Sequence, residues 1–140
     1  MWFDSITEWL LKSPVQGMFS GNTMIIHYTG RKSGKAYHTP VDYLMIKDTL
    51  ITVSYKRRTW WRNLRRGADV KLLLKGKMVP ARAEVVEDDQ GVAEGLKEFA
   101  VENPPKARMI GISFNNDRQP EPASIQKAVK DRVIVRTYLR

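Results

Sequence analysis

The segment that decides the fold reads MIIHYTGRKSGKAYHTPVDYLMI and runs from Met24 to Ile46. Two runs rich in apolar and β-branched residues flank a turn that begins at Gly30 and ends at Gly34. Apolar runs separated by a short glycine-containing stretch are typical of two strands joined by a turn. The sequence therefore predicts strands over residues 22–29 and 36–47 with a turn between them.

The turn itself has the composition of an anion site. Glycines allow backbone N–H groups to converge on a ligand, and Arg31 and Lys32 add fixed positive charge beside the hydroxyl of Ser33. A phosphate or a carboxylate would suit such a cradle. The same five residues taken alone also describe an ordinary solvated loop, because glycine and serine are common turn residues.

In the remainder of the chain, groups of short strands are interrupted by short helices. The order of these elements predicts a mainly β (α+β) protein, a small antiparallel β-barrel of five or six strands with an N-terminal helix and short peripheral helices. A doubly wound parallel sheet would need strict alternation of strand and helix and is excluded. Further strands are expected at 50–55, 70–74, 78–86 and 133–135, helices at 2–12, 59–66, 88–102 and 123–130, and a loop at 106–122.

Composition limits the size and the partners. At 140 residues the chain is expected to form one domain, with an N-terminal helix in residues 1–20, barrel strands in 22–87, and a helix, a loop and the closing strand in 88–140. The net charge of +9 favours anionic ligands without saying which. The chain has no cysteine and two histidines, so no metal site is expected and a reducing cytoplasm suits it.

The predicted N-terminal helix carries two interpretations. Its apolar face holds tryptophan, phenylalanine and leucine side chains, and such a face packs most simply against the body of the domain. The alternative is peripheral membrane contact, because tryptophan and phenylalanine suit a membrane interface. We favour packing, since the polar face carries Lys12 against Asp4 and Glu8 and has no excess of positive charge.

Four stretches make the sequence similar to a known family. TGRKSGKAYHTPVDYLMI, ITVSY, WWRNLRRGADVKLLLKGK and VPARAEVV together resemble the deazaflavin-dependent nitroreductase and quinone reductase family. The resemblance implies a flavin-reductase-like split β-barrel that binds coenzyme F-420. It also implies hydride transfer to an electron-poor small molecule such as a quinone, an enone or a nitro compound.

The resemblance also implies roles for particular residues. The turn would hold the anionic tail, the segment around Pro40 would lie beside the deazaflavin ring, and a tryptophan would pack on that ring. No catalytic residue is implied, and Tyr43 is a candidate proton donor by position only. The residues expected to bind the cofactor are Arg31, Lys32, Ser33, Gly34, Thr39, Pro40, Val41, Ser54, Lys56 and Trp60.

Two departures and two alternatives accompany this interpretation. Tyr37 stands where the family often has arginine, and Tyr138 is the first tyrosine of the C-terminal region, where nitroreductase members carry several. Within the same fold, FMN or haem is the alternative ligand. From another class, a non-catalytic nucleic-acid-binding module would explain the arginines between Arg57 and Arg66, although no nucleic-acid motif is recognisable and no specific nucleic acid is expected.

Overall fold

The structure is a computed structural model that describes residues 23–140, so the predicted N-terminal helix and its possible membrane contact lie outside the described residues. Within this range the chain forms seven strands in one sheet. The strands are β1 (Thr23–Thr29), β2 (Ala36–Asp42), β3 (Leu44–Ile46), β4 (Thr49–Tyr55), β5 (Ala68–Leu74), β6 (Lys77–Val86) and β7 (Arg132–Leu139).

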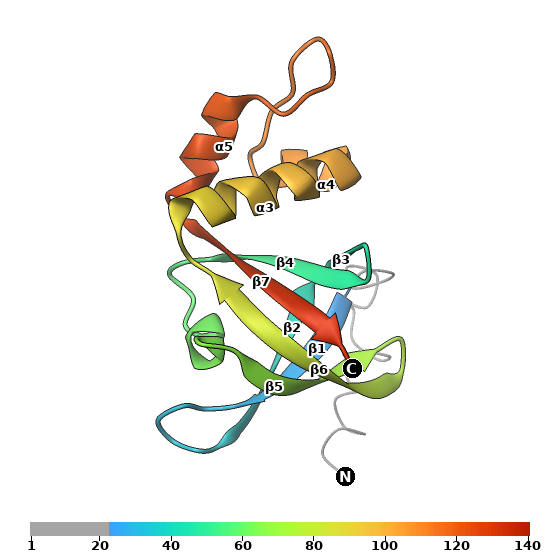
Figure 1. Ribbon diagram of the computed structural model, residues 1–140, viewed down its shortest axis with the longest axis vertical. Helices are drawn as coiled ribbons and strands as arrows, with labels where there is room; N and C mark the ends of the chain where they lie inside the picture. The colour runs from blue at the N-terminus through green and yellow to red at the C-terminus, as the bar shows by residue number, and fades with distance from the viewer. Residues whose placement is uncertain (1–22) are drawn as a thin grey trace.

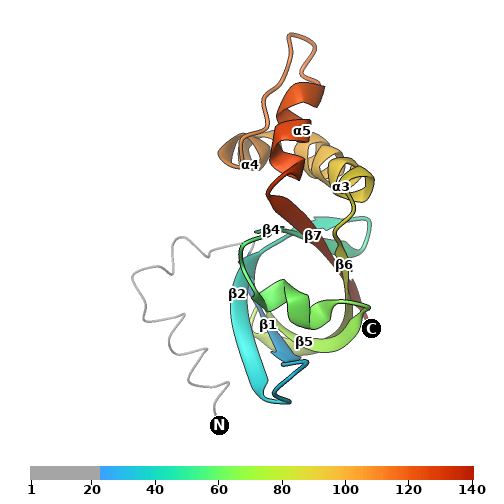
Figure 2. The same cartoon turned by 90° about the vertical axis from the view of Figure 1, so that its left-hand side faces the viewer.

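The sheet is antiparallel throughout and curls into a split barrel. Its strand order is β2-β1-β5-β6-β7-β4-β3, which leaves β2 and β3 as the two edges. Figure 2 looks into the curled sheet, with the strands arranged around a central space. The predicted fold class is therefore confirmed. The short edge strand β3 pairs only with the first three residues of β4, so the rest of β4 faces β2 without a ladder between them. We call the line along which β2 and β4 face each other the seam.

The predicted strand 36–47 is wrong in one respect, because the chain breaks at Tyr43 into β2 and β3. The reason lies in the topology. β2 pairs with β1 at one edge of the sheet, whereas β3 pairs with β4 at the other edge. The chain must cross the seam between them, so a single strand cannot continue. This crossing also explains why seven strands form where five or six were predicted.

Two hydrophobic cores lie on the two faces of the strands β4 and β7. Leu50 and Val135 point into the barrel interior, and Ile51 and Ile134 point to the opposite face beneath the helices. Figure 1 shows α3, α4 and α5 on that outer side of β4 and β7. Strands buried on both faces read as continuous apolar runs, which is how the sequence marks them. The closing strand β7 is longer than the predicted 133–135.

Four helices connect or cover the strands in the described part of the chain. They are the 3-10 helix η1 (Trp60–Leu64), α3 (Asp89–Glu102), α4 (Pro104–Met109) and α5 (Pro122–Val129). The first is shorter than the predicted helix 59–66, and it lies across the opening of the barrel in Figure 2. Its buried side chains Trp60, Trp61 and Leu64 belong to the barrel core.

The helix α4 corrects the predicted loop at 106–122. The Asn103 side chain accepts a hydrogen bond from the backbone N–H of Lys106 at 3.0 Å, and Pro104 occupies the first turn. Asparagine caps a helix start well, and proline fits the first turn because no N–H partner is needed there. The residues that end α3 therefore also start α4.

Candidate functional site

The Gly30–Gly34 turn is fixed to the helix η1 by one side chain. The backbone N–H of Arg31 donates to Oδ1 of Asn63 at 3.1 Å, and Nδ2 of Asn63 donates to the carbonyl of Trp60 at 3.2 Å. Asn63 therefore bridges backbone groups of the turn and of η1. Two segments far apart in the sequence thus form one wall, because the amide of Asn63 satisfies a backbone group in each.

The local geometry explains why glycine occupies both positions 30 and 34 of the turn. Gly34 has φ of +70°, a conformation that favours glycine. A Cβ at Gly30 would lie 2.6 Å from the Tyr37 ring and 2.7 Å from Oγ of Ser33, so a side chain there would displace its neighbours. The Ser33 hydroxyl also accepts the backbone N–H of Lys35 at 3.2 Å. The turn is therefore built to keep one shape.

A cavity of about 790 Å³ opens between this turn and η1, and we call it the cationic lobe. Its lining carries four cationic side chains and no carboxylate. Of these, Arg65 alone forms an ion pair within residues 23–140, with Glu87 at 2.9 Å. The lining residues are Tyr28, Gly30, Arg31, Lys32, Ser33, Tyr37, Thr59, Trp60, Arg62, Asn63 and Arg65.

A second cavity of about 270 Å³ lies along the seam between β2 and β4, and we call it the seam lobe. Pro40 suits this place, since the edge strand β2 needs no donor on its open side. Trp60 lines this lobe as well as the cationic lobe. Its indole Nε1 donates to Oγ of Ser54 at 3.1 Å, which fixes the ring at the junction. The lining residues are Pro40, Val41, Asp42, Thr52, Val53, Ser54, Tyr55, Arg58, Trp60 and Arg132.

Seven of the ten residues expected to bind the cofactor line these two lobes, and three do not. Gly34 shapes the turn, as described above. The hydroxyl of Thr39 is buried and shares a 2.9 Å hydrogen bond with the Tyr28 hydroxyl. The backbone N–H of Lys56 donates to the carbonyl of Asp131 at 2.9 Å. These three residues support the walls from behind or from the side.

The candidate proton donor Tyr43 is placed away from both lobes. It lies in the barrel core with 5% of its surface exposed, at the crossing between β2 and β3. Burial raises the pKa of its hydroxyl above the usual 10.0, because a phenolate is poorly solvated there. A buried hydroxyl outside the lobes is badly placed to deliver a proton to a ligand in either of them.

Several lining residues were not singled out as cofactor ligands from the sequence. Arg58, Arg62 and Arg65 belong to the basic cluster for which the sequence offers nucleic-acid binding as the alternative. Tyr28 carried no signal, because an interior strand tyrosine looks like any core residue. Arg132 lies 77 residues from Tyr55, the partner of its guanidinium. Only the ladder between β4 and β7 brings these two residues together.

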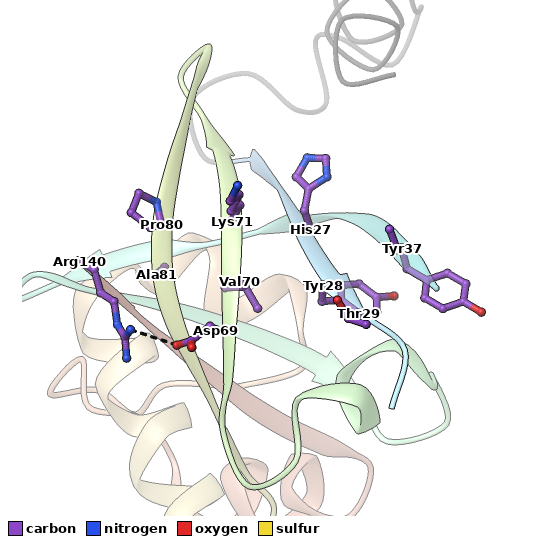
Figure 3. Close-up of a pocket in the computed structure, with 11 residues that line it drawn as sticks. His27, Tyr28, Thr29, Tyr37, Asp69, Val70, Lys71, Pro80, Ala81 and Arg140 are labelled. Atoms are coloured by element: carbon purple, nitrogen blue, oxygen red, sulfur yellow. Dashed lines mark ion pairs between the residues drawn. The ribbon is translucent and has the colours of Figure 1, made fainter. Parts of the chain in front are cut away.

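A third cavity of about 440 Å³ lies on the other side of the β2-β1-β5-β6 part of the sheet, and we call it the outer-face cavity (Figure 3). The cationic side chains that line it are Lys71 and Arg140, and Arg140 has a carboxylate partner. Asp69 accepts ion pairs from Arg140 at 3.1 Å and from Arg82 at 3.5 Å. Burial and the nearby His38 lower the pKa of His27, which lines the same cavity. Because its arginine is already paired, this cavity is the weaker candidate for an anionic ligand.

The family of the chain follows from its sequence together with this architecture. Residues 10–111 match a family model described as F-420H(2)-dependent quinone reductase. The chain belongs to that family. The protein is therefore an oxidoreductase that uses coenzyme F-420 and passes electrons to a small-molecule acceptor, which confirms the predicted family, enzyme class and cofactor. No curated protein matches the chain.

Solved structures agree with the split-barrel fold at low sequence identity. A conserved hypothetical protein of Mycobacterium tuberculosis is 16% identical, with 90% of this chain and 78% of that chain covered and a TM-score of 0.55. An F-420-H(2)-dependent reductase is 17% identical over 83% of this chain and 94% of that chain, with a TM-score of 0.50. An FMN-binding protein of Nostoc punctiforme, related to pyridoxamine 5'-phosphate oxidase, is 9% identical over 99% and 80%, with a TM-score of 0.52.

Among residues 23–140, no helix has the length and apolarity to cross a membrane.

Proposed function

We propose that the cationic lobe holds the phosphate and carboxylates of coenzyme F-420, and that the seam lobe holds its deazaflavin ring. The observation that carries this proposal is the position of Trp60, which lines both lobes and so joins the cations of the turn to a second site where Pro40 and Val41 offer apolar contact. A cofactor with a planar ring and an anionic tail needs these two environments side by side. The acceptor is a quinone, an enone or a nitro compound, and the quinone is the one that the family description favours.

The residues of both lobes fit such a cofactor. Arg31, Lys32 and Arg62 carry positive charge without a carboxylate partner within residues 23–140. Such cations can form charge-assisted hydrogen bonds with phosphate and carboxylate oxygens. The aromatic face of Trp60 and the apolar Val41 offer contact to a planar ring. The backbone N–H groups of Gly30, Arg31 and Gly34 already donate within the protein, so the cationic side chains carry the contact with the anion.

The bound cofactor supplies the hydride, so the protein needs no nucleophile of its own. The roles left to the chain are to bind, orient and exclude water. Asn63 keeps the turn and η1 at a fixed separation, and the bond from Trp60 to Ser54 keeps the indole from rotating. A fixed ring position matters because hydride transfer requires the two reacting carbons in close, aligned contact.

The test is a fluorescence titration of the full-length protein with coenzyme F-420 and with FMN at matched salt. We expect F-420 to bind more tightly, because its long anionic tail uses more of the unpaired cations than a single phosphate does. The affinity should weaken as salt is added, since exposed charges are screened. Equal or tighter binding of FMN would overturn the cofactor placement and favour the FMN alternative.

The remaining partner and compartment expectations belong to the same proposal. We propose that the arginines near η1 serve the cofactor rather than a specific nucleic acid, because Arg62 and Arg65 line the cationic lobe beside Trp60. A cytoplasmic location suits a chain without cysteine.

A further inference from the structure

One arginine of the closing strand is buried at the wall of the seam lobe. Arg132 has 8% of its surface exposed, and it lies beyond residues 10–111, the part of the chain that matches the family. Its guanidinium carbon is 3.8 Å from the centre of the Tyr55 ring, and Nη2 donates to the Tyr55 hydroxyl at 3.0 Å. Both residues line the seam lobe.

The charge of Arg132 is only partly compensated within residues 23–140. Its Nε is buried and makes no hydrogen bond there, although it lies 3.5 Å from Oδ1 of Asp131, a carboxylate that is largely exposed. An arginine buried in the wall of a cavity is costly to maintain for packing alone. Arg57 adds a second guanidinium 4.5 Å from the Tyr55 ring centre. Two guanidinium groups therefore lie close to the Tyr55 ring.

We propose that Tyr55 is the catalytic proton donor to the oxygen of the electron acceptor, and that Arg132 is the residue that positions it. This inference rests on the proposed function, because the acceptor must meet the cofactor ring in the seam lobe. The hydrogen bond from Arg132 occupies a lone pair of the phenol oxygen and leaves the O–H of Tyr55, a lining residue of the seam lobe, available as a donor.

The step balances as follows for a quinone. A reduced deazaflavin held in the seam lobe would supply the hydride, with its C–H bond breaking as a C–H bond forms on the quinone ring. The π electron pair of the quinone would then move onto a carbonyl oxygen. That oxygen takes the proton of Tyr55, so an O–H bond forms on the acceptor as the O–H bond of the phenol breaks. The quinone is reduced by two electrons and the cofactor is oxidised. Arg132 and Arg57 stabilise the phenolate by Coulomb attraction until water returns the proton.

The position of Tyr55 separates it from Tyr43, the candidate suggested by sequence position. Tyr55 is at the end of β4, next to Ser54, whose hydroxyl accepts the Trp60 indole N–H. Its backbone carbonyl also accepts the indole N–H of Trp61 at 3.1 Å. The residue is thus held by its main chain, while its hydroxyl is held by Arg132. Loss of the hydroxyl alone should leave this framework in place.

The test uses Tyr55→Phe in the full-length protein loaded with reduced coenzyme F-420. The variant is mixed with menadione, a naphthoquinone, and cofactor oxidation is followed in a single turnover. We expect the oxidation rate to fall about a hundred-fold, a typical loss for a general acid. The cofactor dissociation constant should stay within about twofold, because the ring and its contacts with Arg132 and Arg57 remain. Added imidazolium should restore part of the rate by supplying the missing proton.

Arg132→Lys and Arg132→Gln test the positioning role. The lysine keeps the charge and should retain more of the rate than the glutamine, and the glutamine should shift the pH profile of the rate because the phenol has lost its charged partner. Matched controls are Tyr138→Phe and Arg136→Gln on the same strand. Tyr138 lies at the far end of β7, and Arg136 pairs with Glu98 of α3 at 3.4 Å. Both controls should behave as wild type.

The outcomes separate this inference from the proposed function. A Tyr55→Phe protein that oxidises the cofactor at the wild-type rate overturns the inference and leaves the cofactor site standing. A rate that falls only in step with cofactor affinity, without rescue by imidazolium, also overturns it, because Tyr55 would then bind the cofactor. A wild-type protein that binds reduced F-420 but does not reduce menadione or another quinone, enone or nitro compound overturns both.

Discussion

The cationic lobe and the outer-face cavity share Tyr28 and Tyr37 in their linings, yet they differ in how many of their cations have a carboxylate partner. On the outer face, one of the two lining cations, Arg140, pairs with Asp69, and Asp69 also pairs with the neighbouring Arg82. In the cationic lobe, one of four cations has a carboxylate partner among residues 23–140, namely Arg65 with Glu87. A hollow with cations is therefore not enough to mark an anion site, because a neighbouring carboxylate removes most of the attraction.

The two cavities also differ in how their walls are fixed. The cationic lobe is bounded by a turn and a helix that Asn63 joins through two hydrogen bonds. The outer-face cavity lies over regular strands, and its ion pairs involve side chains that are mostly well exposed. Exposed ion pairs contribute little and break easily. A prearranged wall with unpaired cations is the better device for holding an anion.

The largest expected effect is at Trp60, the residue common to the cationic and seam lobes. Trp60→Ala removes a side chain that is 6% exposed, and truncating such an aromatic costs about 3–5 kcal/mol in the free energy of unfolding. It should also abolish measurable cofactor binding, since the ring contact is lost. Chemical denaturation and fluorescence titration measure the two effects.

Trp61→Ala is the matched control for this change. Trp61 is 2% exposed and lines neither lobe, so its truncation should cost similar stability while the folded protein still binds the cofactor. If both tryptophan variants bind equally well when folded, Trp60 is a core residue only and the comparison of the two cavities loses its main support.

The next effect distinguishes two exposed lysines, one in each cavity. Lys32→Ala should weaken binding of full-tail F-420 roughly ten- to a hundred-fold, the typical worth of a charge-assisted contact. Lys71→Ala in the outer-face cavity should leave the affinity unchanged. Stability should hardly change in either variant, because exposed side chains contribute little.

A titration with a deazaflavin that lacks the phosphate and the tail sharpens this pair. Lys32→Ala should leave its affinity unchanged, because no anion reaches the turn. Equal weakening for both ligands would mean that Lys32 lies near the ring and that the cofactor runs through the two lobes in the reverse direction.

A smaller effect should appear on the outer face as the pH is lowered. Burial, with the nearby His38 as a second cause, lowers the pKa of His27 below the usual 6.5. The unfolded chain therefore takes up this proton first, and the free energy of unfolding should decrease as the pH falls below about 6.5. Denaturation of wild type and His27→Gln at several pH values from about 5 to about 8, the range in which histidine titrates, measures this decrease in the free energy of unfolding. An equally steep pH dependence in the variant would assign the loss to other groups.

The smallest expected effect is on nucleic acid. Because its cations form a short lobe around η1, the protein should show weak, non-specific binding at low salt that disappears at physiological salt. A mobility-shift assay at both salt concentrations measures this. Binding with a sequence preference at physiological salt would mean that the arginines near η1 bind nucleic acid rather than the cofactor.

Local patterns were sufficient for most of the barrel. The alternation and β-branching around Leu50 and Val133 predicted strands that form, and Asp88 starts a helix that buries Leu96. Local patterns did not predict the structure at two places, the break between β2 and β3 and the start of α4. The break at Tyr43 depends on which edge of the sheet each half joins, and α4 depends on Asn103 acting as its N-cap as well as ending the preceding helix.

The sequence by itself determined the strands, the Gly30–Gly34 turn and the family, because these depend on short-range periodicity, turn chemistry and motif order. Only the tertiary structure decided which cations remain without a carboxylate partner, since pairing depends on residues far apart in the chain such as Arg65 and Glu87. The same holds for the buried contact between Arg132 and Tyr55, which exists because β7 returns beside β4. Charge can be counted from a sequence, but its neutralisation is a matter of distance.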